Sequence, residues 1–150
     1  LPLARVITPN AEEAGRLLGL PVATLEEMKG AAKLLQERGT PHVVVTGGHL
    51  DKPADVYYDG QELEVFSSVR IESQSTHGTG CTFSSAILAG LIHGKGILES
   101  IVLAKAYVSL AIARAYPIGA GGGPLNHLFR FAESQPRVIG PDLVHEVPRP

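Results

Sequence analysis

The sequence has one cysteine, no tryptophan and no long basic run. The near absence of cysteine and the absence of a basic run exclude whole classes of protein. The 150 residues include one cysteine, which rules out a disulfide within the chain and a cysteine-rich zinc site. The formal net charge is −2 without a long lysine or arginine run, which argues against nucleic acid or a membrane surface as partner. No apolar stretch reaches membrane-spanning length. A lone cysteine also fits a reducing compartment, so we expect a cytoplasmic protein.

Hydrophobic residues make up 44% of the chain, which is enough to build the core of one domain. Periodicity and turn signals predict, in order, a strand over 3–8, helices after Asn10 and Thr24, a buried strand over 42–46, short strands over 54–59, 61–66 and 69–71, helices over 80–93, 97–116 and 125–131, and an irregular tail over 135–150. This order indicates an α/β fold in which helices flank a mostly parallel sheet with an antiparallel hairpin at Asp59-Gly60. Small and apolar residues on nearly every side of 80–93 predict a central, buried helix.

The stretch Ser75-Thr76-His77-Gly78-Thr79-Gly80-Cys81-Thr82 opens that apolar helix and is the main functional candidate. Glycines let backbone N–H groups approach a ligand closely, and the first turn of a helix binds anions, most often phosphate. A cysteine at a helix N-terminus is favoured as thiolate, so Cys81 is a potential base or nucleophile. Two other interpretations stay open: a plain helix start with Cys81 as a small buried residue, and a cysteine hydrolase that uses His77.

Further candidates follow the other predicted strands, at the edge where ligands of α/β folds gather. Asn10 and Glu13 either cap a helix or help to hold magnesium, and the capping box alone accounts for both residues. Thr46 either contacts a phosphate through its hydroxyl or simply ends a strand, before Gly47-Gly48. The loop over 119–124 either covers a nucleotide base or connects two helices.

Four of these motifs occur in the order found in one family. They are Thr8-Pro9-Asn10-Ala11-Glu12-Glu13-Ala14, Thr46-Gly47-Gly48-His49, His77-Gly78-Thr79-Gly80-Cys81-Thr82 and Gly119-Ala120-Gly121-Gly122-Gly123-Pro124-Leu125-Asn126-His127. The chain resembles the carboxyl half of the hydroxymethylpyrimidine/phosphomethylpyrimidine kinases of thiamine biosynthesis, which belong to the ribokinase-like superfamily. The resemblance implies that 1–150 is the carboxyl-terminal part of one ribokinase-like domain.

The resemblance implies a role for each candidate residue. The turn Gly78-Thr79-Gly80-Cys81 matches the anion hole of the transferred phosphoryl group, and Cys81 matches the base that takes the substrate's hydroxyl proton. Asn10 and Glu13 match a pair that organises Mg²⁺. The implied contacts with ATP come from Thr46 and Gly48 near the phosphates and from Gly121 and Gly123 near adenine. The implied reaction phosphorylates 4-amino-5-hydroxymethyl-2-methylpyrimidine and then its monophosphate.

Two departures from the family pattern shape these expectations. Thr46 stands where the family commonly has a lysine, so the resemblance does not carry a cationic ATP contact over to this strand. The family's amino half, which supplies its first strands and most of the pyrimidine pocket, is not in this chain, so we expect an incomplete sheet and no efficient kinase activity from the chain alone. A pyridoxal kinase-like enzyme and a non-catalytic nucleotide- or phosphate-binding fragment remain as alternatives, and the resemblance leaves open whether a homodimer forms.

Overall fold

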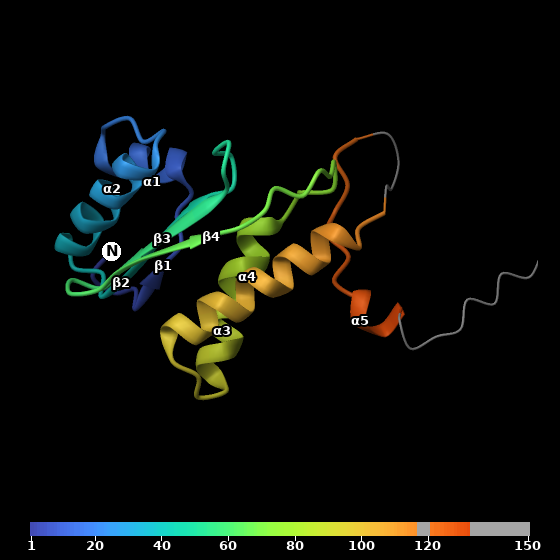
Figure 1. Ribbon diagram of the computed structural model, residues 1–150. Coiled ribbons are helices and arrows are strands. Elements are labelled where there is room, and N and C mark those ends of the chain that lie inside the picture. The colour runs from blue at the N-terminus through green and yellow to red at the C-terminus, as the bar shows by residue number, and fades with distance from the viewer. Residues whose placement is uncertain (117–120, 133–150) are drawn as a thin grey trace, which may run out of the picture.

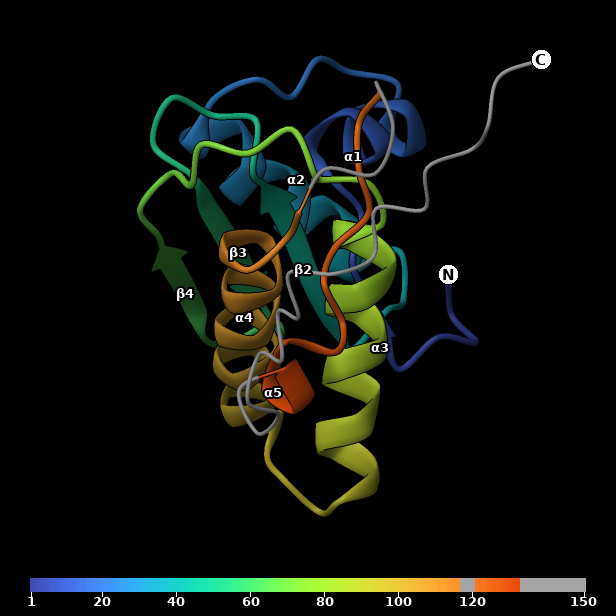
Figure 2. The ribbon, with the colours of Figure 1, turned by 90° about the vertical axis from the view of Figure 1, so that its right-hand side faces the viewer.

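A four-stranded sheet forms the middle layer of the computed structural model, which describes residues 1–116 and 121–132. Its strands lie side by side in chain order: β1 (Val6–Ile7), β2 (His42–Gly47), β3 (Ala54–Tyr58) and β4 (Leu63–Ser67). One face carries the helices α1 (Ala11–Leu18) and α2 (Leu25–Glu37), and the other carries α3 (Thr79–Ile92) and α4 (Ile97–Ala113) (Figures 1 and 2). The short helix α5 (Phe129–Ala132) follows at the side of α4.

The valines of β2 explain why the sheet is covered on both sides. Successive side chains of a strand point to opposite faces, so a run of apolar residues needs apolar cover on each face. Val43 and Val45 pack with Met28 and Leu35 of α2, whereas Val44 packs with Phe83 and Ile87 of α3. All three valines are fully buried. The expected α/β class, with helices on both faces of a sheet, is confirmed.

The share of parallel pairing is smaller than the sequence predicted. Among the four strands of the described chain, only β1 and β2 pair in parallel, while β2 with β3 and β3 with β4 pair antiparallel. The reason is the length of the connections, because a parallel pair needs a long crossover and only the link through α1 and α2 supplies one. The prediction of a strand over 69–71 is wrong: the ladder ends at β4, and Val69 is exposed.

The two helix starts predicted from capping boxes are confirmed. Asn10 and Thr24 each accept a hydrogen bond from the backbone of the glutamate three residues later, and each glutamate accepts one in return. Gly19 ends α1 in the left-handed conformation, with φ at 74°. These local signals place the crossover that makes β1 and β2 parallel.

The expectation that residues 80–93 form a buried central helix is wrong for this chain. Within α3 only Phe83 and Ile87 are buried, whereas Leu88 is 58% and Ile92 73% exposed. The sheet and α4 cover two sides of α3, and no other element of the described chain covers the rest. Apolar residues on all sides of α3 indicate that the helix needs apolar neighbours on all sides, and the described residues supply only some of them.

Some expectations fall outside the described residues. The tail over 135–150 and the first two residues of the glycine loop, Gly119 and Ala120, are among them. Among the residues described, no helix combines the length and the apolar character needed to cross a membrane.

Candidate functional site

The carboxyl ends of β1 and β2 lie next to each other. Asn10, just past β1, forms an isolated parallel bridge with Thr46 in the last two residues of β2, and the Thr46 N–H donates to the carbonyl oxygen of Pro9 over 2.9 Å. Gly48 is the first residue after β2 and is exposed, with open space where a Cβ would stand. The structure thus brings the sequence candidates Asn10, Thr46 and Gly48 to one edge of the sheet.

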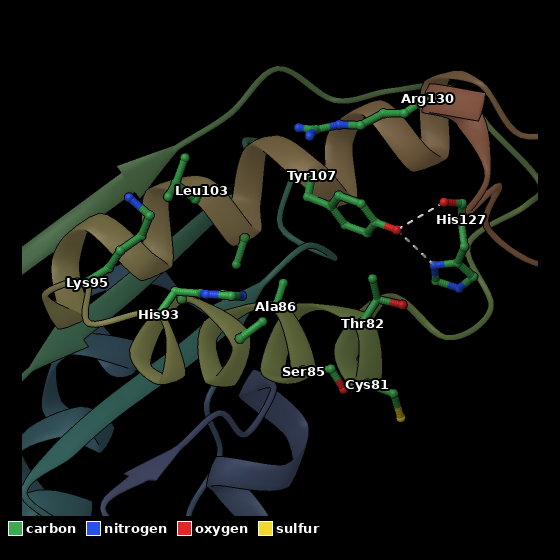
Figure 3. Close-up of a pocket in the computed structure, with 13 residues that line it drawn as sticks. Cys81, Thr82, Ser85, Ala86, His93, Lys95, Leu103, Tyr107, His127 and Arg130 are labelled. Atoms are coloured by element: carbon green, nitrogen blue, oxygen red, sulfur yellow. Dashed lines mark hydrogen bonds between the residues drawn. The ribbon is translucent and has the colours of Figure 1, made fainter. Parts of the chain in front are cut away.

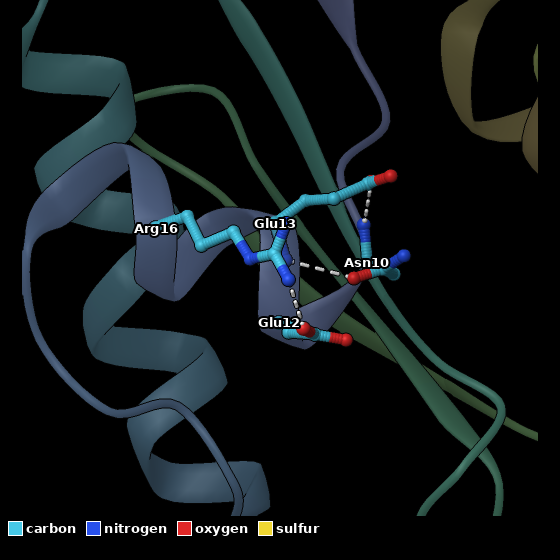
Figure 4. Close-up of polar contacts among 4 residues, drawn as sticks. All are labelled: Asn10, Glu12, Glu13 and Arg16. Atoms are coloured by element: carbon cyan, nitrogen blue, oxygen red, sulfur yellow. Dashed lines mark hydrogen bonds and ion pairs between the residues drawn. The ribbon is translucent and has the colours of Figure 1, made fainter.

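Asn10 and Glu13 are engaged with each other as a helix cap (Figure 4). The Glu13 N–H donates to Asn10 Oδ1, and the Asn10 N–H donates to Glu13 Oε2, both over 2.8 Å. Glu13 Oε1 makes no hydrogen bond in the described part of the chain. One carboxylate oxygen beside the carboxyl ends of two strands is therefore left for a further partner. The described residues contain no cluster of three or more histidine, cysteine or acidic side chains that could hold a metal by themselves.

The N-terminus of α3 is open, unlike those of α1 and α2. Its N-cap is Gly78, which has φ at 88° and offers no side-chain hydrogen bond. The N–H groups of Gly80 and Cys81 find no acceptor among the described residues, because the first helical bond runs from the Thr82 N–H to the Gly78 carbonyl over 2.9 Å. Unpaired amides and the positive end of the helix dipole therefore point out of the same turn.

Cys81 is an exposed free thiol, which contradicts the interpretation of this residue as a small buried core side chain. Its sulfur points away from Tyr107 and His127 across the neighbouring groove (Figure 3). No hydrogen bond joins Cys81 to His77 in the described structure, so the pairing that a cysteine hydrolase would need has no support. In its thiolate form, an exposed cysteine next to unpaired helix amides can instead take a proton from a group held at that turn.

The late glycine loop packs against the segment that leads into this turn. The His77 N–H donates to the Gly123 carbonyl over 3.3 Å, and His77 forms a parallel bridge with Pro124. A Cβ on Gly123 would stand 2.4 Å from Ser75 Oγ, so only glycine fits there without a shift. Gly121, in contrast, has open space around it. The structure therefore places Gly123 beside Ser75 and His77, just before Gly78, and leaves Gly121 at the surface.

A groove of about 860 Å³ runs between α3 and α4 from Cys81 (Figure 3). Its floor is made of small residues, and its far end carries basic side chains. Near the α3 N-terminus, the Tyr107 hydroxyl donates to the His127 carbonyl over 3.2 Å while the two rings stack. The lining residues are Cys81, Thr82, Ser85, Ala86, Ala89, Gly90, His93, Lys95, Leu103, Ala104, Tyr107, His127 and Arg130.

One polar pair at the site edge escaped the sequence analysis. Asp55 of β3 accepts from the Gly47 N–H at 3.1 Å through Oδ1 and from Lys105 of α4 at 2.5 Å through Oδ2. Lys105 also lines a recess of about 270 Å³ between α4 and the end of β4. The signal was a charged residue within a largely apolar stretch of each element, Asp55 in Ala54–Tyr58 and Lys105 in the middle of Ile97–Ala113, since buried charges need partners.

The fold and this edge together define a class of protein. A layered α/β fold with an uncapped, glycine-rich helix N-terminus at the carboxyl ends of its strands is typical of phosphate-binding proteins. Comparison with known families is more specific: the model of the phosphomethylpyrimidine kinase family matches residues 1–126. The chain belongs to this family.

The relatives are named as kinases of two kinds of substrate, a hydroxymethylpyrimidine in some and pyridoxine or pyridoxal in others. The chain is 43% identical over 136 residues to a hydroxymethylpyrimidine/phosphomethylpyrimidine kinase of Rhizobium meliloti, covering 87% of this chain and 51% of the relative. It is 42% identical over 131 residues to a putative pyridoxine kinase of Staphylococcus epidermidis, covering 85% and 48%. An ADP complex of Bacillus subtilis pyridoxal kinase superimposes with a TM-score of 0.82 at 42% identity, covering 87% and 50%. This chain therefore spans about half the length of these relatives.

Proposed function

We propose that this chain carries the nucleotide and phosphoryl-transfer part of a kinase that phosphorylates 4-amino-5-hydroxymethyl-2-methylpyrimidine and then its monophosphate, with ATP as donor. The observation that carries the proposal is the open N-terminus of α3, where the N–H groups of Gly80 and Cys81 have no acceptor within the described chain. Membership of the phosphomethylpyrimidine kinase family supports phosphoryl transfer as the reaction at this turn. In this proposal residues 1–150 form the carboxyl-terminal part of one ribokinase-like domain.

The residues of the turn divide the chemistry between them. Within the turn from Gly78 to Cys81, the unpaired amides of Gly80 and Cys81 would hold the terminal phosphoryl group while its negative charge shifts toward the leaving ADP. Phosphoryl transfer passes through a loose transition state, so such fixed donors contribute more than a strong base. The substrate's hydroxymethyl oxygen would form the new bond to phosphorus as the bond to the ADP oxygen breaks. The hydroxyl proton would go to the thiolate form of Cys81, which becomes the thiol, and the exposed position of the side chain permits this contact.

The rest of the nucleotide is assigned to the neighbouring loops. Thr46 and Gly48 would contact the ATP phosphates at the carboxyl end of β2, where Gly48 has open space. Gly121 and Gly123 would border the adenine, supported by the position of the loop beside His77.

Glu13 fits a Mg²⁺ site in which the carboxylate contacts the ion through water molecules, and not a site in which protein ligands alone surround the ion. Mg²⁺ near nucleotides usually keeps several waters and takes one or two carboxylates plus phosphate oxygens. The cap leaves Glu13 Oε1 available and keeps Asn10 fixed beside it. When bound, the ion would neutralise charge on the transferred phosphates. Glu13 and Asn10 would orient its waters.

Cys81→Ala tests the role of the thiol. In a polypeptide that joins this chain to the remaining half found in its relatives, we expect turnover to fall by at least about a hundredfold, the usual contribution of a positioned proton acceptor. ADP affinity should stay within about twofold, because an exposed side chain is removed and the amides remain. Equal turnover by the variant and the unmodified protein would remove Cys81 from the mechanism.

A pyridoxal kinase-like activity is the second candidate, because a pyridoxine kinase relative is as similar to this chain as a pyrimidine kinase relative. Steady-state assays of the joined polypeptide with the pyrimidine alcohol and with pyridoxal decide between the two by their ratio of kcat/KM. Binding of ATP without a phosphorylated product from either alcohol would favour a non-catalytic nucleotide-binding role instead.

A further inference from the structure

The ion pair between Asp55 and Lys105 differs from the other ion pairs of the described chain in its burial. The side chains of Asp55 and Lys105 are only 11% and 17% exposed, whereas both partners of the Glu12–Arg16 pair are more than 70% exposed. A buried pair is often no more stabilising than apolar residues of the same shape. Its presence beside the candidate site therefore asks for an explanation other than stability.

Asp55 holds the backbone where β2 ends. Its Oδ1 accepts a hydrogen bond from the Gly47 N–H. The Gly47 carbonyl in turn accepts one from the Leu50 N–H over 3.1 Å, which closes the turn. Gly47 cannot be replaced without a shift, since a Cβ would stand 2.4 Å from the Ala54 carbonyl oxygen and 2.8 Å from Met28 Cε. The direction in which the chain leaves toward Gly48 is thus fixed by a carboxylate on one side and by close packing on the other.

A carboxylate is an unfavourable neighbour for a polyanion. An uncompensated negative charge at Asp55, next to the end of β2, would repel the phosphates of a nucleotide held at Gly48. Lys105 reaches Asp55 from α4 and cancels that charge through its contact with Oδ2. The carboxylate can then hold the Gly47 amide without adding net charge to the site.

We propose that Asp55 and Lys105 are positioning residues for the nucleotide: Asp55 sets the backbone at Gly47 and Gly48, and Lys105 neutralises Asp55 beneath the phosphates. The inference rests on the proposed function, since it needs a nucleotide at this edge. The proposed role differs from that of a purely structural ion pair in the direction in which each of two single substitutions changes nucleotide affinity. A structural pair is damaged alike by the loss of either partner, whereas an electrostatic screen gives opposite effects on nucleotide affinity.

The test uses three variants of the pair and one control variant, each in the full 150-residue chain, with ADP and Mg²⁺ as the probe in isothermal titration. Lys105→Gln removes the positive charge but keeps a donor for Asp55, and Asp55→Asn removes the negative charge but keeps an acceptor for the Gly47 N–H. The double variant Asp55→Asn/Lys105→Gln restores neutrality with an amide pair. Lys95→Gln is the matched control, because it removes one lysine charge from the exposed Lys95–Glu99 pair beside the first turn of α4.

At low salt we expect Lys105→Gln to weaken ADP binding roughly tenfold, because one added negative charge faces a polyanion. Asp55→Asn should bind ADP at least as tightly as the unmodified chain, and the double variant and Lys95→Gln should lie within about twofold of it. The loss in Lys105→Gln should shrink at about 1 M salt, where screening is strong. Each variant is first checked for its free energy of unfolding, and the double variant keeps the comparison valid if a single variant is too unstable.

Two outcomes overturn the inference in distinguishable ways. If the unmodified chain binds ADP but both single variants lose affinity equally and without salt dependence, the pair is structural and the inference fails alone. If the unmodified chain binds no ADP, the proposed nucleotide site fails and takes the inference with it.

Discussion

Alanine at Gly78 and at Gly80 should separate the stability of the α3 turn from its binding of phosphate. Gly78 has φ at 88°, and a Cβ there would meet no atom within 4 Å. The whole cost of Gly78→Ala is therefore the left-handed backbone, about 1–2 kcal/mol. Gly80 lies inside the first turn of α3, and its Cβ would also meet open space, so Gly80→Ala should raise the free energy of unfolding by up to about 1 kcal/mol.

The assay is thermal unfolding of the 150-residue chain followed by circular dichroism, where 1 kcal/mol corresponds to about 2–4 °C in Tm. Gly78→Ala should melt below and Gly80→Ala above the unmodified chain. Both variants should nevertheless bind ADP at least about tenfold more weakly, since a charge-assisted hydrogen bond contributes about 1.5–3 kcal/mol and the methyl group or the shifted turn removes it. The open space at Gly80 is the place that a phosphate would fill.

Either half of this result can refute the reasoning. An unchanged Tm in Gly78→Ala would mean that the turn relaxes and that its left-handed conformation is not required. A Gly80→Ala variant that is more stable and binds ADP as well as the unmodified chain would mean that no phosphate approaches this helix end, and the proposed function would lose the observation that carries it.

Two further predictions concern stability and pH. Gly90→Ala should lower the free energy of unfolding by about 1–3 kcal/mol, because its Cβ would stand 2.5 Å from Ser100 Oγ on α4. Gly30→Ala on α2, where a Cβ meets open space, should instead raise the free energy of unfolding by up to about 1 kcal/mol. Equal effects of the two substitutions in urea unfolding would contradict the close packing of α3 on α4. Backbone hydrogen bonds from Glu62 and Gln61 lower the pKa of Asp59 below its ordinary 3.8, so its contribution to stability is present above about pH 4 and is lost as the pH falls further. Asp59→Asn, which keeps the acceptor oxygen, should therefore show a shallower loss of stability between about pH 4 and pH 2, and identical pH profiles would show that the Asp59 hydrogen bonds do not act on stability.

The parts of the fold that were predictable are those encoded by near neighbours in sequence. The caps at Asn10 and Thr24 depend on a residue three positions away, and both were predicted correctly. The two-sided burial of β2 followed from its unbroken run of valines. The open turn at Gly78 was also readable, since glycine and a missing polar cap are local features.

The features that were missed depend on residues far apart in the chain or on what covers an element. Asp55 and Lys105 are 50 positions apart, and nothing in either segment identifies the other as its partner. Burial of α3 was overestimated because composition reports that a helix needs cover, not that cover is present. The stretch over 69–71 has strand-like residues but lies beyond the last pairing of β4.

The edge strand β1 has a practical consequence for anyone who prepares this chain. Within the described residues it is paired along one side only, so the main-chain donors and acceptors on its other side are a template for lateral growth. Concentrated solutions of the isolated chain will tend to self-associate there, and a light-scattering series against concentration will record it. β1 leads into the cap at Asn10, so a segment that paired with its free side as far as Ile7 would end close to the candidate site.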